Sequence, residues 1–189
     1  MSDPADTELW LVRHGQTEWS RDGRHTSTTD LPLTEVGESE AAGVRDRLAG
    51  TDFDLVLTSP RQRARRTAEL AGFGDAEVDD DLAEWAYGEY EGVTTPEIRE
   101  RVPGWTVWTH PVPGGESAEE VAARLDRVVA RALMQRRTLV FAHGHSLRVL
   151  TARWLDLAAA EGRHFRLETA TISVLGFERE SRVLLKWNV

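Results

Sequence analysis

The chain has 189 residues, no cysteine, and 32 acidic against 23 basic side chains, for a formal net charge of -9. This length suits one well-cored domain, and the lack of cysteine excludes disulfides, thiolate metal sites and cysteine nucleophiles. The negative charge excludes nucleic-acid binding through a broad basic face, so any attraction to a phosphate group must be local.

Hydropathy along the chain predicts a cytoplasmic protein. Residues 1–7 are polar and acidic and lack the basic start and apolar core of a signal peptide. No apolar run approaches membrane-spanning length, so we expect no membrane segment. The sequence leaves the oligomeric state open, with a homodimer as one alternative.

Strand-like and helical patterns alternate along the first half of the chain. An apolar run over residues 8–12 predicts a buried strand. A helical pattern follows over residues 34–48, with an apolar stripe of Val36, Ala41, Val44 and Leu48. A second strand is expected over residues 54–58. Residues 59–71 then predict a helix with Ser59 as its N-cap.

The second half continues this alternation. A helix is expected over residues 117–135, because its first four residues have the spacing of a capping box. Strands are predicted over residues 138–142, 171–177 and 183–187, the last two as a hairpin at a sheet edge. The sequence therefore predicts an α/β fold with a mostly parallel sheet and an antiparallel edge.

One stretch, residues 82–116, has a looser pattern rich in Trp, Tyr, Gly and Pro. We expect a single domain over residues 1–189 in which this stretch is a small lid-like insertion over the ligand-binding end of the sheet. We expect the aromatic residues of this stretch to pack against one another. The alternative is that some of them contact the carbon skeleton of a substrate.

Arginine and histidine side chains gather where the predicted strands end, which is where ligands bind in open α/β sheets. The residues concerned are Arg13, His14, Arg63 and His143. Singly, each is more often a structural polar residue. Together, two arginine forks suit phosphate oxygens and a histidine can act as nucleophile. A carboxyl such as Glu84 can protonate a leaving oxygen, and the helix after Ser59 offers free N–H groups. The combination predicts phosphoryl transfer through a phosphohistidine.

Four sequence blocks resemble, in order, those of the histidine phosphatase superfamily, which includes cofactor-dependent phosphoglycerate mutases and many phosphatases. The blocks are LVRHGQTEWS, TSPRQRARRTAEL, LAEWAYGEYEG and VFAHGHSLRVL, and they span residues 11–150. A lone Arg-His-Gly is weak evidence, whereas four ordered blocks are specific. The resemblance implies a phosphoglycerate mutase-like three-layer α/β/α sandwich and catalysis without a metal or other cofactor.

The resemblance also implies a role for each site residue. His14 would be the nucleophile, Arg13 and Arg63 would clamp the phosphoryl group, and His143 would donate to its oxygens. Glu84 would act as general acid and then as base. The expected substrate-binding residues are Gln16, Thr17, Ser20, Thr26, Ser27, Tyr87, Gly144 and His145. Burial and the flanking arginines should lower the pKa of His14, and Glu84 must keep its proton, so we expect an acidic pH optimum.

The blocks look more like the sugar-bisphosphatase and acid phosphatase branch than like the mutases. The region after the acid block is short and has only Arg99 and Arg101 as cations, and Trp85 stands where glycolytic mutases usually have arginine. We therefore expect a metal-independent phosphomonoesterase acting on small phosphorylated metabolites, sugar phosphates among them. Phosphoglycerate mutase-type transfer is the runner-up.

Two interpretations from other classes stay open. A zinc site could be built from His14, His143, His145 and Glu84, although arginines beside a divalent cation argue against it. A non-catalytic protein that binds a phosphorylated ligand is the other alternative, and the filled catalytic positions argue against that. His110 and His164 have no assigned role.

Overall fold

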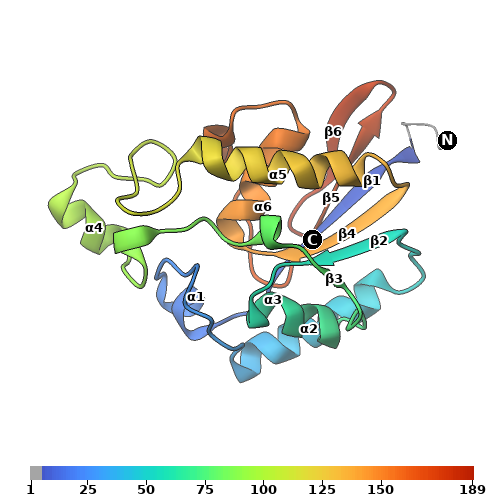
Figure 1. Ribbon diagram of the computed structural model, residues 1–189. Helices are drawn as coiled ribbons and strands as arrows, with labels where there is room; N and C mark the ends of the chain where they lie inside the picture. The colour runs from blue at the N-terminus through green and yellow to red at the C-terminus, as the bar shows by residue number, and fades with distance from the viewer. Residues whose placement is uncertain (1–5) are drawn as a thin grey trace.

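The computed structural model describes residues 6–189 and contains one six-stranded sheet in the order β3-β2-β4-β1-β5-β6 (Figure 1). Strands β1 to β4 pair in parallel, and β5 and β6 form an antiparallel hairpin beside β1. The expected fold is confirmed, but the expectations for residues 1–5 lie outside the described residues. The strands are β1 (Glu8–Arg13), β2 (Leu55–Thr58), β3 (Glu77–Val78), β4 (Arg137–Ala142), β5 (Ile172–Glu178) and β6 (Ser181–Lys186).

Helices cover both faces of the sheet, so the domain has three layers (Figure 1). Strand β1 is buried on both sides: Leu9 and Leu11 face one hydrophobic cluster and Val12 faces the other. The first cluster holds the apolar faces of α5 and α6, and the second holds those of α2 and α3. The covering helices are α2 (Glu35–Leu48), α3 (Gln62–Leu70), α5 (Ala118–Ala132) and α6 (Gly144–Trp154).

Short elements connect these layers. They are α1 (Glu18–Asp22), α4 (Thr95–Arg101) and the 3-10 helices η2 (Asp80–Leu82), η3 (Gly88–Tyr90) and η4 (Ala159–His164). Residues 82–116 include η3 and α4 and extend to one side of the sheet (Figure 1). Trp85 and Trp105 in this stretch are each 1% exposed, so packing explains these two aromatic residues. No helix in residues 6–189 is long and apolar enough to cross a membrane.

The beginning of α3 differs from the prediction. Its N-cap is Arg61 rather than Ser59, and the N–H of Gln62 donates to the Asp30 carboxylate at 2.9 Å. A residue from another loop therefore caps the N-terminus of α3. The N–H of Gln62, which was expected to be free for a phosphate, donates to Asp30 instead. The Ser59 side chain is fully buried and contacts a histidine instead.

Helix α2 also differs in its buried face. Val36 is 55% exposed, and Gly37 joins Ala41, Val44 and Leu48 on the buried side. A Cβ atom on Gly37 would collide with the backbone of Gln16, and one on Gly15 would collide with Gly37. The two glycines therefore let the loop after β1 pack against α2. The expected helix over residues 117–135 also ends earlier, at Ala132.

Candidate active site

Parallel pairing of β1 with β4 brings the two predicted histidines together. Arg13 is in register with Ala142, and the His14 N–H donates to the Ala142 carbonyl at 3.0 Å. His14 and His143 are the residues that directly follow this pair, so the two rings meet, with their centroids 5.2 Å apart. The site is built at the carboxyl ends of the central strands, where ligands bind in this class of sheet.

The tautomer of His14 follows from its backbone contact. Nδ1 lies 2.8 Å from the carbonyl oxygen of Gly15, and because a carbonyl only accepts, Nδ1 must carry the proton. Nε2 then keeps its lone pair. Burial, together with the charges of Arg63 and Arg13, lowers the pKa of His14 well below its usual value. The predicted direction of this shift is confirmed, and the lone pair of Nε2 is suited to nucleophilic attack.

The two arginines are held in different ways. Arg13 Nη1 donates to the Leu167 carbonyl at 2.5 Å, while its buried Nε has no acceptor among the described residues. Arg63 is 1% exposed and donates to the carbonyls of Thr26, Ser27 and Thr29. Arg63 thus orders the loop over residues 26–29, and Arg13 keeps a buried donor that suits an anion.

His143 is held between two polar side chains. Arg63 Nε lies 3.2 Å from Nδ1, and Ser59 Oγ lies 2.6 Å from Nε2. Arginine can only donate, so Nδ1 accepts and Nε2–H donates to Ser59. His143 was expected to donate to a phosphoryl group. In the structure its one N–H donates to Ser59 instead. Burial, Arg63 and His14 lower the pKa of His143 well below its usual value.

Glu84 lies at the N-terminus of α6 and accepts three backbone hydrogen bonds. Oε1 accepts from Trp85 at 2.8 Å and from Ser146 at 2.7 Å, and Oε2 accepts from His145 at 2.9 Å. Burial raises the pKa of Glu84 although these donors oppose the shift. Oε2 has only one donor, so it is the oxygen with room for a proton. The carboxyl is suited to a general acid.

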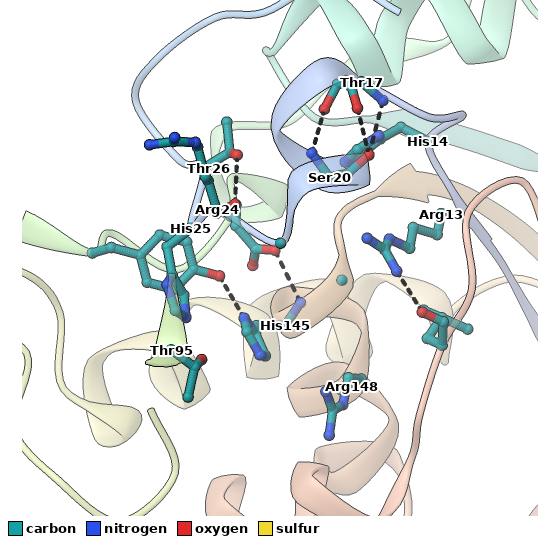
Figure 2. A pocket seen from close by; sticks show the side chains of 15 residues that line it. Arg13, His14, Thr17, Ser20, Arg24, His25, Thr26, Thr95, His145 and Arg148 are labelled. Atoms are coloured by element: carbon teal, nitrogen blue, oxygen red, sulfur yellow. Dashed lines mark hydrogen bonds between the residues drawn. The ribbon is translucent and has the colours of Figure 1, made fainter. Parts of the chain in front are cut away.

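Arg13, His14 and Glu84 line a pocket of about 240 Å³ (Figure 2). Its lining includes nine predicted site residues: Arg13, His14, Thr17, Ser20, Thr26, Glu84, Tyr87, Gly144 and His145. Four others lie outside the lining: Gln16, Ser27, Arg63 and His143. Arg63 and His143 contact each other, and Gln16 Oε1 accepts a hydrogen bond from the Thr34 hydroxyl at the start of α2. The Ser27 hydroxyl donates to the Glu84 carbonyl and so positions the acid.

Thr17 and Ser20 form a capping box for α1. Thr17 Oγ1 accepts from the Ser20 N–H, and Ser20 Oγ donates to the Thr17 carbonyl at 3.0 Å. The hydroxyl of Ser20, a residue expected to bind substrate, thus donates inside the loop, because capping satisfies backbone groups that the short helix leaves unpaired.

The structure adds residues that the sequence analysis did not select. Arg24, Thr95, Arg148 and Leu167 also line the pocket. Arg148 follows His145 by three residues on α6, and this helical spacing could have revealed it. His145 Nδ1 lies 2.5 Å from the Tyr87 hydroxyl.

The remaining histidines have local partners. His110 lies 2.9 Å from Thr109 Oγ1, and His164 pairs with Glu161 at 3.1 Å. Within residues 6–189 no group of three or more His, Asp or Glu side chains is arranged to hold a metal ion.

The chain is similar to proteins of one known family. The family model described as histidine phosphatase superfamily (branch 1) matches residues 9–189. Acid phosphatase from Mycobacterium tuberculosis is 47% identical over 181 residues, which cover 93% of this chain and 89% of that protein. Sedoheptulose 1,7-bisphosphatase from Saccharomyces cerevisiae is 37% identical, covering 78% of this chain and 67% of that protein. A solved Mycobacterium tuberculosis structure matches with a TM-score of 0.93 at 44% identity, covering 97% of each chain.

Proposed function

The chain belongs to branch 1 of the histidine phosphatase superfamily, and from this premise we propose that it hydrolyses small phosphorylated metabolites through a phosphohistidine at His14. One observation carries the proposal: His14 has a free Nε2, and beside it the pocket is lined by Arg13, with its unpaired buried Nε, and by the Glu84 carboxyl. A pocket of about 240 Å³ is below the range of roughly 300 to 1,000 Å³ that suits drug-sized ligands, which favours a small substrate.

In the first step, Nε2 of His14 attacks the phosphorus atom, and the N–P bond forms as the ester P–O bond breaks. The proton on Oε2 of Glu84 goes to the departing alkoxide, which leaves as an alcohol. Arg13 donates to the phosphoryl oxygens, and Arg63, whose charge reaches His14 from outside the lining, adds positive charge nearby, so the protein supplies the positive charge. To join them, the N–H of His143 must turn from Ser59 towards the phosphoryl group.

In the second step, the Glu84 carboxylate takes a proton from water while the water oxygen attacks the phosphorus atom. The N–P bond breaks, which releases phosphate and restores neutral His14 and protonated Glu84. The cycle needs neutral His14 and protonated Glu84 at the same pH. A lowered pKa at His14 and a raised pKa at Glu84 support an acidic optimum.

Residues 82–116 act as the lid of a single domain in this proposal, because Glu84, Tyr87 and Thr95 come from this stretch and line the pocket. Arg99 and Arg101, the cations of the region after the acid block, lie outside the lining. This supports hydrolysis over mutase-type transfer. The names of the two relatives, an acid phosphatase and a sugar bisphosphatase, support a phosphorylated metabolite as the substrate.

The test is turnover of p-nitrophenyl phosphate together with trapping of the phosphorylated enzyme. We expect an acid-labile, base-stable label that His14→Ala abolishes along with turnover. His164→Ala, at an exposed histidine paired with Glu161, is the matched control and should retain both. Conversion of 3-phosphoglycerate to its 2-isomer faster than any phosphate release would instead support a mutase.

A further inference from the structure

An ion pair outside the pocket holds the segment that carries Glu84. Arg124 on α5 pairs with Glu116 through two contacts, Nε to Oε1 at 2.8 Å and Nη2 to Oε2 at 2.9 Å. The Arg124 side chain is 11% exposed and that of Glu116 is 25% exposed, so the pair is largely removed from water. Both residues lie outside the lining of the pocket that contains His14. A two-point pair of this kind fixes the orientation of both side chains.

Arg124 uses all five of its N–H donors, and three of them reach the main chain beside the acid. Nη1 donates to the carbonyls of Asp81 and Ala83 at 2.6 and 2.7 Å, and Nη2 donates to the carbonyl of Glu84 at 3.3 Å. The other two donors bind the Glu116 carboxylate. A guanidinium group presents its donors in one rigid plane, so it holds these three carbonyls in fixed relative positions.

Glu116 holds the main chain on the other side of the acid. Its Oε2 accepts from the Ala86 N–H at 2.9 Å, and its own N–H donates to the Ala86 carbonyl at 3.0 Å. Its carbonyl accepts from Trp85 Nε1 at 2.8 Å. A Cβ atom on Gly115 would collide with the Ala86 carbonyl oxygen, so the close approach of these two segments requires glycine there. The chain is therefore fixed both before and after Glu84.

The carboxyl group of Glu84 depends on this placement. It accepts from the N–H groups of His145 and Ser146 at the start of α6. These groups lie in the first turn, where the helix itself offers no acceptor, and the N-cap residue His143 makes no side-chain capping bond. A shift of the segment would break these bonds and move the acid away from the leaving oxygen. A misplacement of about 1 Å can lower a rate by roughly 10²-fold.

We propose that Arg124 and Glu116 are positioning residues for the general acid, and that their ion pair holds the Glu84 carboxyl where it can protonate the leaving group. The inference rests on the proposed phosphatase function and deepens it, because it makes one step of that reaction depend on a contact outside the pocket.

The kinetic test compares two substrates whose leaving groups differ in their need for a proton. Arg124→Met removes the charge and the five donors but keeps an unbranched side chain. We expect it to lower kcat/KM for glycerol 3-phosphate by roughly 10- to 100-fold. The loss for p-nitrophenyl phosphate should be much smaller, because nitrophenolate leaves readily without a proton. Arg124→Lys, which keeps the charge on a single nitrogen, should restore part of the activity towards glycerol 3-phosphate.

Glu116→Gln perturbs the same pair from its other side. One amide oxygen can still accept from Ala86, but the amide nitrogen then faces a donor of Arg124. We expect the same bias against glycerol 3-phosphate. The control is Arg153→Met, which breaks another pair between α5 and α6, with Asp126, and should leave the ratio of the two kcat/KM values unchanged. A ratio that stays unchanged in Arg124→Met and in Glu116→Gln overturns the inference, whether both rates fall or neither does.

Amide hydrogen exchange, measured by NMR, separates this inference from the proposed function. The N–H groups of His145 and Ser146 have Glu84 as their acceptor whether or not the chain hydrolyses anything. We expect Arg124→Met to speed their exchange roughly tenfold more than that of Val149, which reports the stability of the middle of α6. This result supports the positioning role even if the wild type hydrolyses neither substrate. Equal changes at the three amides overturn it even if the enzyme is an active phosphatase.

Discussion

The substitution Glu84→Gln tests the acid with the smallest change of shape. Oε1 accepts from Trp85 and Ser146, and an amide oxygen there can accept both bonds. The amide nitrogen then faces the N–H of His145, which now donates to Oε2 at 2.9 Å. The amide N–H of the new side chain and the N–H of His145 are both donors and cannot bond to each other. The variant therefore loses the carboxyl proton and one buried hydrogen bond.

The expected losses follow from these two changes. Removal of a general acid lowers the rate by roughly 10²- to 10⁴-fold, which corresponds to about 3 to 5 kcal/mol of transition-state stabilisation. An unsatisfied buried donor lowers the free energy of unfolding by about 1 to 3 kcal/mol. Domains are typically stable by roughly 5 to 15 kcal/mol. We therefore expect Glu84→Gln to fold, with reduced stability and a large loss of activity.

The assay compares two leaving groups. Nitrophenolate leaves readily without a proton, whereas the alkoxide of glycerol 3-phosphate needs one. Glu84→Gln should thus lower kcat/KM far more for glycerol 3-phosphate than for p-nitrophenyl phosphate. The control is Asp126→Asn, which makes the same carboxylate-to-amide change in a partly exposed pair with Arg153. Equal losses on both substrates would refute the assignment of Glu84 as the acid.

Two further predictions concern the ionisation and orientation of the site. Because burial and the arginines lower the pKa of His14 while burial raises that of Glu84, kcat/KM for an alkyl phosphate should be high at mildly acidic pH. It should fall as the pH rises through the pKa of Glu84, and a pH–rate profile still rising above about pH 8 would contradict this. Ser59→Ala leaves the buried His143 Nε2–H without its partner, which should lower the free energy of unfolding in urea by about 1 to 3 kcal/mol. An unchanged urea midpoint would show that Ser59 does not hold His143.

Local sequence patterns were sufficient to predict the elements that carry the site. The apolar run of β1 and the capping box of α5 are short-range signals, because they depend on side-chain alternation and on residues three apart. Parallel pairing then required that the residues after β1 and β4 meet at one edge. The proximity of His14 and His143 was therefore predictable.

Other contacts depend on residues that are far apart in the chain. Serine is a residue type that often caps helices, yet Ser59 contacts His143, which lies 84 positions further along the chain. Arg63 orders the loop over residues 26–29 by donating to main-chain carbonyl groups. Every amino acid has this group, so the sequence cannot show which carbonyls an arginine will bind. The deviation at α3 has the same origin, because Asp30 caps that helix from another loop.

The sequence by itself determined the main alternation of strands and helices, the family, and which side chains are candidates for the reaction. Only the tertiary structure decided their chemical states. Gly15 sets the tautomer of His14, burial shifts the pKa values of His14 and Glu84 in opposite directions, and Arg63 and Ser59 set the tautomer of His143. The physical reason is that the electrostatic field at a buried atom sums over neighbours from the whole fold, whereas a sequence pattern records only neighbours along the chain.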